Sequence, residues 1–238
     1  MVNDKLAAPG LRWDGSLHRN VIARLVLQIT LLFAVTSAIL FGAAGTIRWP
    51  AGWVFTIEFH GGSLALGLWL AKHSPQLLEK RLDGIVQKSQ PVWDRVVLVV
   101  ALLLFMGWLA AMGRWHGSLP LVLQIGGALL ILACFVIVQR TFRENAFTAP
   151  VVKIQEAQQV VSTGPYSIVR HPMYAGVLLF FIGAPLLLSS WVGLCWLPVL
   201  AALLAVRAVL EERTLAEGLP GYREYAARVR YRLIPYVW

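Results

Sequence analysis

The stretch Met173–Leu210 reads MYAGVLLFFIGAPLLLSSWVGLCWLPVLAALLAVRAVL, which is 38 residues with one charged side chain, Arg207. A single helix of that length would be about 57 Å long at 1.5 Å per residue. The hydrocarbon core of a membrane is only about 30 Å thick, so one helix would overshoot it. Pro185, Ser189-Ser190 and Pro198 offer places to turn. The stretch therefore predicts a tight helical hairpin of two membrane crossings, with its turn near Ser189-Ser190.

Four further apolar runs precede this hairpin, and each is long enough to cross a membrane. They are Leu25–Gly45, Ala51–Ala71, Val96–Gly113 and Ser118–Val138. With the hairpin they predict an all-α, polytopic membrane helical bundle of about six transmembrane crossings. The tail predicts a short amphipathic helix over Tyr222–Tyr231 on the cytoplasmic side. We therefore expect an N-terminal four-helix transmembrane region, residues 1–139, and a second region, residues 140–238, made of a polar loop, the hairpin and the tail.

Composition and charge agree with a membrane protein. Hydrophobic residues make up 58% of the 238 residues and charged residues only 14%, which excludes a disordered chain and an ordinary soluble enzyme. The net charge of +9 indicates loops that lie against anionic lipid, and not a nucleic-acid partner. Basic residues gather in the loops on one side of the membrane, among them Lys5, Arg12 and Lys88, while the other side carries only Arg48 and Arg114. Because basic loops stay inside, both termini are expected in the cytoplasm, and the compact loops favour a bacterial inner membrane.

The densest polar cluster comes just before the hairpin and reads STGPYSIVRHPMYAG over residues 162–176. Gly164-Pro165 predicts a turn. The proline after His171 disfavours helix at His171 and can start the next crossing. Tyr166, His171 and Tyr174 then sit where the chain enters the membrane. One interpretation is an aromatic belt with a helix cap, and the other is a binding site.

A second polar cluster, Arg207 with Glu211-Glu212, lies at the other end of the hairpin. Arg207 and Glu211 are four residues apart on one helix face, so a helix-end ion pair is the simplest interpretation. Arg207 follows an uninterrupted apolar run, however, and charged groups at membrane depth usually face a cavity. A hairpin brings its two ends side by side, so the two clusters are expected to form one pocket open to the cytoplasm. No spacing of His, Cys and Asp predicts a metal site.

The pattern Thr-Gly-Pro-Tyr…Arg-His-Pro-Met-Tyr-Ala-Gly, followed by Glu211-Glu212, resembles the isoprenylcysteine carboxyl methyltransferase family. Phospholipid N-methyltransferases share a related C-terminal pattern. The resemblance covers about Val151–Trp238 and implies an integral-membrane methyltransferase that uses S-adenosylmethionine, with residues 140–238 as the methyltransferase-like catalytic region. It implies a lipid-like or prenylated acceptor reached from the membrane, and carboxyl, thiol, amine and hydroxyl acceptors all stay open.

The resemblance also places the site residues. In the family the cofactor is contacted by four parts of the pattern. They are the His-Pro-x-Tyr segment, the upstream tyrosine, the stretch before that tyrosine and the first glutamate of the pair. The arginine four residues before that glutamate faces the acceptor. The implied cofactor-binding residues are Gln158, Gln159, Val160, Val161, Tyr166, His171, Pro172, Met173, Tyr174 and Glu211, and the implied catalytic residue is Arg207. With the cofactor on Glu211, the polar head of the acceptor is the expected partner of Arg207.

The residue types suit that chemistry. Tyrosine faces stabilise a cation such as a sulfonium by about 0.5–2 kcal/mol. A carboxylate can accept from ribose hydroxyls or an ammonium group. No Gly-x-Gly-x-x-Gly follows a strand, so a Rossmann site is not expected. Methyl transfer demands alignment of donor and acceptor, and the planar fork of Arg207 suits the orientation of a carboxylate.

Two other functions fit parts of the same sequence. Sterol reductases resemble this C-terminal region and bind NADPH, but they tend to show Arg-Asp where this chain has Glu211-Glu212. A non-enzymatic membrane sensor or assembly factor that keeps the fold is the other alternative. Glu58 and His60, near the middle of the second crossing, are expected to form hydrogen bonds between helices, with substrate contact as the alternative.

Overall fold

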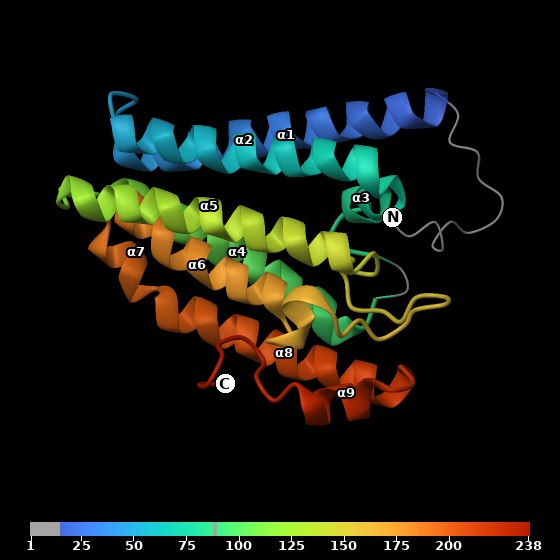
Figure 1. Ribbon diagram of the computed structural model, residues 1–238. Coiled ribbons are helices and arrows are strands. Elements are labelled where there is room, and N and C mark those ends of the chain that lie inside the picture. The colour runs from blue at the N-terminus through green and yellow to red at the C-terminus, as the bar shows by residue number, and fades with distance from the viewer. Residues whose placement is uncertain (1–14, 88–89) are drawn as a thin grey trace.

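The computed structural model describes residues 15–87 and 90–238, and helices make up all the regular structure in those residues (Figure 1). The elements are α1 (Gly15–Ala44), α2 (Pro50–His73), α3 (Pro75–Leu82), α4 (Val92–Arg114), α5 (Leu121–Glu144), the 3-10 helix η2 (Gly164–Ser167), α6 (Pro172–Leu187), α7 (Trp191–Cys195), α8 (Leu197–Gly218) and α9 (Tyr222–Arg228). The all-α bundle that the sequence predicts is confirmed.

Five helical segments of the described chain are long and apolar enough to cross a membrane. They are Arg19–Ala44, Pro50–His73, Val92–Arg114, Leu121–Glu144 and Trp191–Gly218. The apolar helix α6 has 16 residues, which correspond to about 24 Å. The protein is therefore a multi-pass integral membrane protein, and its five long apolar helices and one shorter one come close to the six crossings that the sequence predicts.

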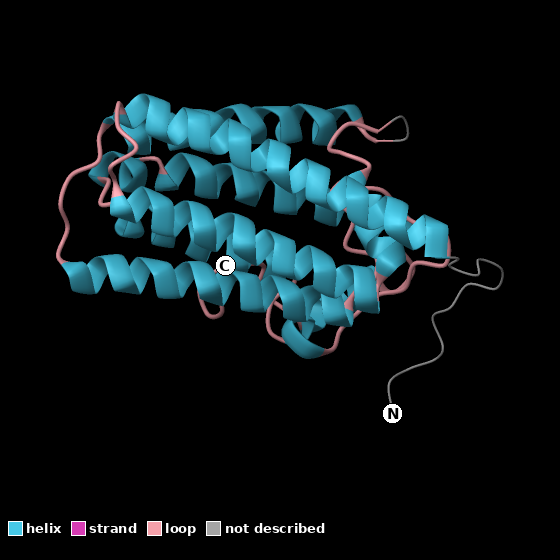
Figure 2. Ribbon diagram, turned by 90° about the horizontal axis from the view of Figure 1, so that it is seen from above, coloured by secondary structure: helices cyan, strands magenta, loops and turns pink. Residues whose placement is uncertain are grey.

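The helices lie nearly parallel, with their loops at the two ends of the bundle (Figure 2). α1 and α2 form one layer, and α2 contacts α5 and α6 in the next (Figure 1). α5 and α6 approach each other closely because glycines lie where they meet. A Cβ on Gly127 would lie 2.5 Å from the Gly183 carbonyl oxygen, and a Cβ on Gly183 would lie 2.6 Å from that of Gly127. Any larger side chain at either position would force the two helices apart.

The hairpin turns at the predicted place. α6 ends at Leu187, and Ser189 has a φ of 56°. The Ser190 side chain then caps α7 by accepting a hydrogen bond from the Gly193 amide. α8 returns along α6, so its last turns lie beside the start of α6. This return brings the two polar clusters of the sequence together.

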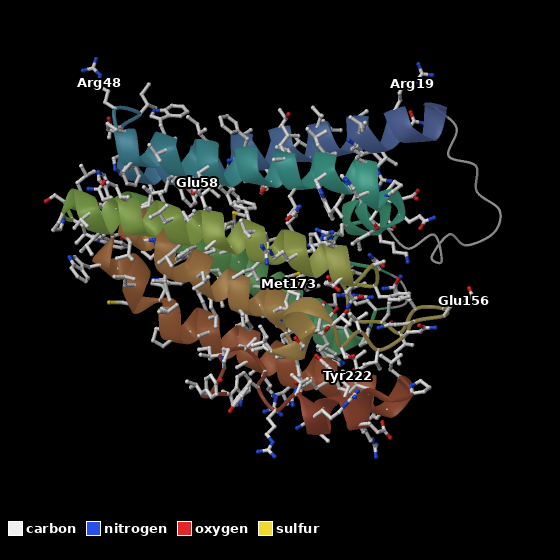
Figure 3. All side chains as sticks on the ribbon, viewed as in Figure 1. Arg19, Arg48, Glu58, Glu156, Met173 and Tyr222 are labelled. Carbon is white, nitrogen blue, oxygen red and sulfur yellow. The ribbon has the colours of Figure 1, made fainter. Side chains whose placement is uncertain are left out.

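The two ends of the bundle differ in the residues they carry. Figure 3 places Arg19, Glu156 and Tyr222 toward one end and Arg48 at the other. The predicted boundary between residues 139 and 140 falls inside α5, and the tail helix ends at Arg228, earlier than expected. Three of the basic residues behind the predicted orientation lie outside the described residues: Lys5, Arg12 and Lys88. The orientation and the two-region division stay predictions.

Candidate active site

One cavity at the loop-rich end of the bundle collects side chains from several parts of the chain. Its walls come from residues 145–161, η2, the start of α6, the last turns of α8 and the tail helix α9. All the residues that the sequence predicts for the site line it: Gln158, Gln159, Val160, Val161, Tyr166, His171, Pro172, Met173, Tyr174, Arg207 and Glu211. The structure thus brings the predicted residues together, while their roles toward a cofactor or acceptor stay predictions.

The turn before α6 fixes Tyr166 in the cavity wall. Gly164 has a φ of 56°, and a Cβ there would lie 2.6 Å from Glu144 Cγ, so the turn needs glycine. The Tyr166 hydroxyl accepts a hydrogen bond from Asn145 Nδ2 at 3.0 Å, and its carbonyl accepts one from the Tyr225 hydroxyl at 2.9 Å. Burial raises the pKa of Tyr166 to about 12. The phenol therefore stays neutral at physiological pH.

His171 and Tyr174 stack at the start of α6. His171 occupies the N-cap position because Pro172 begins the helix. The two rings have centroids 5.3 Å apart and an interplanar angle of 3°. The Tyr174 hydroxyl donates a 2.7 Å hydrogen bond to Glu211 Oε2, and His171 Nδ1 lies 3.9 Å from the same oxygen. Among the described residues nothing donates to Glu211 Oε1, so this oxygen is open to a ligand.

The neighbouring Glu212 lies in a saturated ion-pair cluster. Arg170 donates two hydrogen bonds to the Glu212 carboxylate, from Nε to Oε1 at 2.7 Å and from Nη2 to Oε2 at 3.2 Å. His171 Nε2 lies 3.1 Å from Oε1, and Arg232 Nε donates to Oε2 at 3.0 Å. Arg170 Nη1 also donates to three carbonyls at the end of the tail helix: Ala226, Val229 and Arg230. Glu212 therefore connects the turn, α8 and the tail. The sequence analysis did not predict that Arg170 is the main partner of Glu212.

Arg207 pairs with Asp94, so the i,i+4 ion pair with Glu211 is not formed. Its Nε and Nη2 each lie 3.2 Å from Asp94 Oδ1, and Nη2 donates to the Pro150 carbonyl at 2.6 Å. Asp94 is thus the carboxylate partner of Arg207 in this structure, and the contact of Arg207 with an acceptor stays a prediction. Arg207 pairs with the distant Asp94 and not with Glu211 because Asp94 is 0% exposed, and a carboxylate buried so completely needs a charged partner.

The stretch Gln158–Val161 forms a part of the wall that is apolar only at its two valines. Val160 and Val161 pack against a buried cluster from η2, the end of α8 and the start of α9: Tyr166, Leu219, Tyr222 and Tyr225. Gln158 Oε1 accepts a hydrogen bond from the Gln155 amide at 2.9 Å, which closes a local turn. All four residues of the stretch line the cavity.

Glu58 and His60 do not line this cavity, and Figure 3 shows Glu58 far from Met173 and Tyr222. His60 Nε2 lies 3.0 Å from Thr36 Oγ1 on α1, so the predicted bond between helices is confirmed for His60. For Glu58 the same expectation is wrong. Both of its carboxylate oxygens are buried without a hydrogen-bond partner in the described part of the chain. Its i,i+2 offset from His60 places it on a different face of α2.

The comparison with known families links part of the chain to a group of membrane methyltransferases. Residues 122–220 match the model of the phospholipid methyltransferase family. This family and the isoprenylcysteine carboxyl methyltransferases form one superfamily of integral-membrane methyltransferases, and the matched segment of the chain is similar to it. The matched segment runs from α5 through α8 and contains all eleven predicted site residues. The resemblance drawn from the sequence motifs is thereby confirmed, and the superfamily implies a membrane methyltransferase.

A similar protein is the cobalt-zinc-cadmium resistance protein CzcN of Cupriavidus metallidurans. It is 29% identical over 158 residues, which are 65% of this chain and 68% of CzcN. Within residues 15–87 and 90–238, no group of three or more His, Cys, Asp or Glu side chains is placed to hold a metal ion.

Proposed function

We propose that this chain is an integral-membrane, S-adenosylmethionine-dependent methyltransferase of the isoprenylcysteine carboxyl methyltransferase type. It transfers a methyl group to an amphiphilic or lipid-like acceptor, with residues 140–238 as its catalytic region. The observation that carries the proposal is one cavity in which the His171–Tyr174 stack lies beside a Glu211 carboxylate with an open oxygen. The superfamily supports the class of reaction, and this arrangement supports the choice of cofactor.

The residue types of the cavity fit S-adenosylmethionine. When bound, this cofactor supplies an electrophilic methyl group on a sulfonium. The faces of Tyr166 and Tyr174 would stabilise the positive charge. Glu211 Oε1 would accept hydrogen bonds from the ribose hydroxyls or the ammonium group. Val160 and Val161 would pack against the adenine.

The position of the cavity favours an amphiphilic acceptor. Arg207 and Met173 belong to apolar helices, whereas Lys153 and Gln159 belong to the polar loop, and all four line the same cavity. A molecule could keep its apolar tail among lipids while its polar head reached the cavity. Among the described residues Arg207 Nη1 makes no hydrogen bond, so it can orient that head. A carboxylate head suits this donor best.

The cavity is proposed to face the cytoplasm of a bacterium, with both termini of the chain on that side of the inner membrane. Basic residues concentrate at the cavity end. Cysteine labelling tests this orientation in a variant without Cys134 and Cys195. Cysteines at the exposed positions Ser118 and Ser162 should react from opposite sides of the membrane. Reaction of both from one side would contradict the topology.

Calorimetric titration of the detergent-purified protein with S-adenosylhomocysteine and, separately, with NADPH tests the cofactor. We expect S-adenosylhomocysteine to bind and NADPH to give no heat of binding. NADPH binding alone would support the reductase alternative, and binding of neither would support a non-enzymatic role. His171→Ala should weaken S-adenosylhomocysteine binding. His116→Ala is the matched control, because His116 stacks on Trp49 at the opposite end of the bundle.

A further inference from the structure

We propose that Asp94 is a positioning residue that holds Arg207 away from Glu211 and so keeps the Glu211 carboxylate open to the cofactor. The inference rests on the proposed function, because it concerns the same cavity. Asp94 lies in the first turn of α4, outside the segment 122–220 that matches the family model. The N-terminal part of the chain would then prepare a site whose ligand contacts come from the C-terminal part.

Contacts other than Arg207 fix the position of the Asp94 carboxylate. Its side chain is fully buried. Oδ2 accepts hydrogen bonds from Gln90 Nε2 at 2.8 Å and from the Val152 amide at 2.9 Å. Oδ1 is left for Arg207, whose Nε and Nη2 both lie 3.2 Å away. The carboxylate therefore presents one oxygen to the guanidinium in a fixed direction.

Arg207 has a second carboxylate within reach. Glu211 follows it by four residues in α8, the spacing at which helical side chains meet. The Tyr174 side chain lies against both residues: its ring centroid is 5.8 Å from the Arg207 guanidinium carbon, and its hydroxyl is 2.7 Å from Glu211 Oε2. A buried guanidinium that lost Asp94 would turn to the nearest remaining carboxylate. Glu211 Oε1 would then be engaged by Arg207 and closed to a ligand.

A second cation strengthens this competition. Arg81 in α3 donates to the Thr148 carbonyl at 2.9 Å, two residues before the Pro150 carbonyl that binds Arg207. Burial, and then the positive charge of Arg207, lower the pKa of Arg81 to about 10. Arg81 therefore stays charged at neutral pH and repels Arg207. Asp94 offsets that repulsion, and without it Glu211 is the carboxylate left to do so.

The test measures S-adenosylhomocysteine affinity by calorimetry in a double-mutant cycle. The Asp94→Asn variant alone should bind S-adenosylhomocysteine about tenfold more weakly than the wild type. The reason is that Arg207 would then occupy the Glu211 carboxylate, which otherwise accepts hydrogen bonds from the ligand. In the Arg207→Gln background the same Asp94→Asn change should alter affinity by less than about threefold, since no cation is left to occupy Glu211. The double variant should therefore bind more tightly than Asp94→Asn alone.

The recovery of affinity separates this role from a merely structural one, because a second substitution does not repair a distorted site. Unchanged affinity in Asp94→Asn, or no recovery in the double variant, would overturn the inference. A wild-type protein that binds no S-adenosylhomocysteine would instead contradict the proposed function. Asp83→Asn is the matched control: it removes the exposed carboxylate paired with Arg24 and should bind like the wild type.

If Asp94→Asn alone does not fold, the change is compared in the Arg207→Lys and Arg207→Gln backgrounds. Lysine keeps a cation beside Glu211, and glutamine does not. The inference then expects about tenfold weaker S-adenosylhomocysteine binding with lysine than with glutamine. Equal affinities in the two backgrounds would overturn it.

Discussion

The two adjacent glutamates of α8 lie in opposite kinds of surroundings. Glu212 has both oxygens engaged, by Arg170, His171 and Arg232, and its side chain is only 11% exposed. Glu211 accepts one hydrogen bond, from Tyr174, and its side chain is 26% exposed. The region around Glu212 is closed, and its contacts join different segments of the chain. The region around Glu211 faces the cavity, and one carboxylate oxygen there is open to a ligand.

The difference follows from helix geometry. Consecutive residues on a helix point about 100° apart, so Glu212 turns toward the tail while Glu211 turns toward the start of α6. The closed cluster holds the backbone amides of Arg170 and His171 against the Tyr231 and Arg232 carbonyls at 2.9 Å. That clamp fixes the segment that carries the His171–Tyr174 stack. In a single Glu-Glu motif, Glu212 thus joins parts of the fold, while Glu211 faces the cavity and is proposed to bind the ligand.

Glu212→Gln should produce the largest effect on the protein. The change removes the ion pairs of Glu212 and leaves Arg170, which is 9% exposed, without its carboxylate. Breaking a buried pair from one side costs about 3–5 kcal/mol. Thermal unfolding in detergent should show a strongly lowered midpoint, whereas Glu211→Gln should stay close to the wild type. Equal midpoints for the two variants would erase the distinction between the regions.

Arg207→Lys should act on the open region and on turnover. Lysine keeps the charge but loses the planar fork that reaches Asp94 and Pro150 together. Transfer of a tritiated methyl group from S-adenosylmethionine into a bacterial polar-lipid extract should fall about tenfold, the loss of one charged hydrogen bond. S-adenosylhomocysteine affinity should stay nearly intact. Full transfer in this variant would remove Arg207 from the site.

Tyr174→Phe should have a smaller effect, on cofactor affinity. Phenylalanine keeps the ring that stacks on His171 but cannot donate to Glu211. A neutral donor to a carboxylate contributes about 1 kcal/mol, so S-adenosylhomocysteine should bind roughly fivefold more weakly. Tyr174→Leu, which also removes the ring, should weaken binding further. Equal affinities for the two variants would show that the ring does not contact the ligand.

Glu58→Met should give the smallest effect and the opposite sign. Glu58 is the contrast to both glutamates of α8, because its buried oxygens have no partner among the described residues. Methionine has similar length and no polar atoms, so it removes an unsatisfied group worth about 1 kcal/mol. The thermal midpoint in detergent should rise by a few degrees. A clear fall would mean that Glu58 has a partner in the membrane.

Run length and motif position predicted the hairpin and the membership of the cavity. The stretch Met173–Leu210 is too long for one crossing, and its proline and serine residues mark the turn near Ser189, so the two polar clusters had to meet. Tyr166, His171 and Glu211 could be placed together on that basis alone. This placement could be predicted because the two helices of the hairpin follow each other in the sequence, so a tight turn between them brings their outer ends together.

Long-range pairing is the part that the sequence could not predict. Asp94 and Arg207 are 113 residues apart, and Asp94 looks in the sequence like an ordinary acidic residue in the first turn of a helix. The i,i+4 rule predicts Arg207 with Glu211, worth a few tenths of a kcal/mol, but a fully buried carboxylate outweighs it. Arg170, 42 residues from Glu212, escaped prediction for the same reason.

Titration of S-adenosylhomocysteine into Glu211→Gln and Glu217→Gln tests the central claim most directly. Both changes replace a glutamate of α8 by its amide, but Glu217 is exposed and does not line the cavity. If Glu211 holds the cofactor, Glu211→Gln should bind at least about tenfold more weakly than the wild type, while Glu217→Gln should bind equally well. Equal affinity of both variants and the wild type would contradict the placement of the cofactor in this cavity.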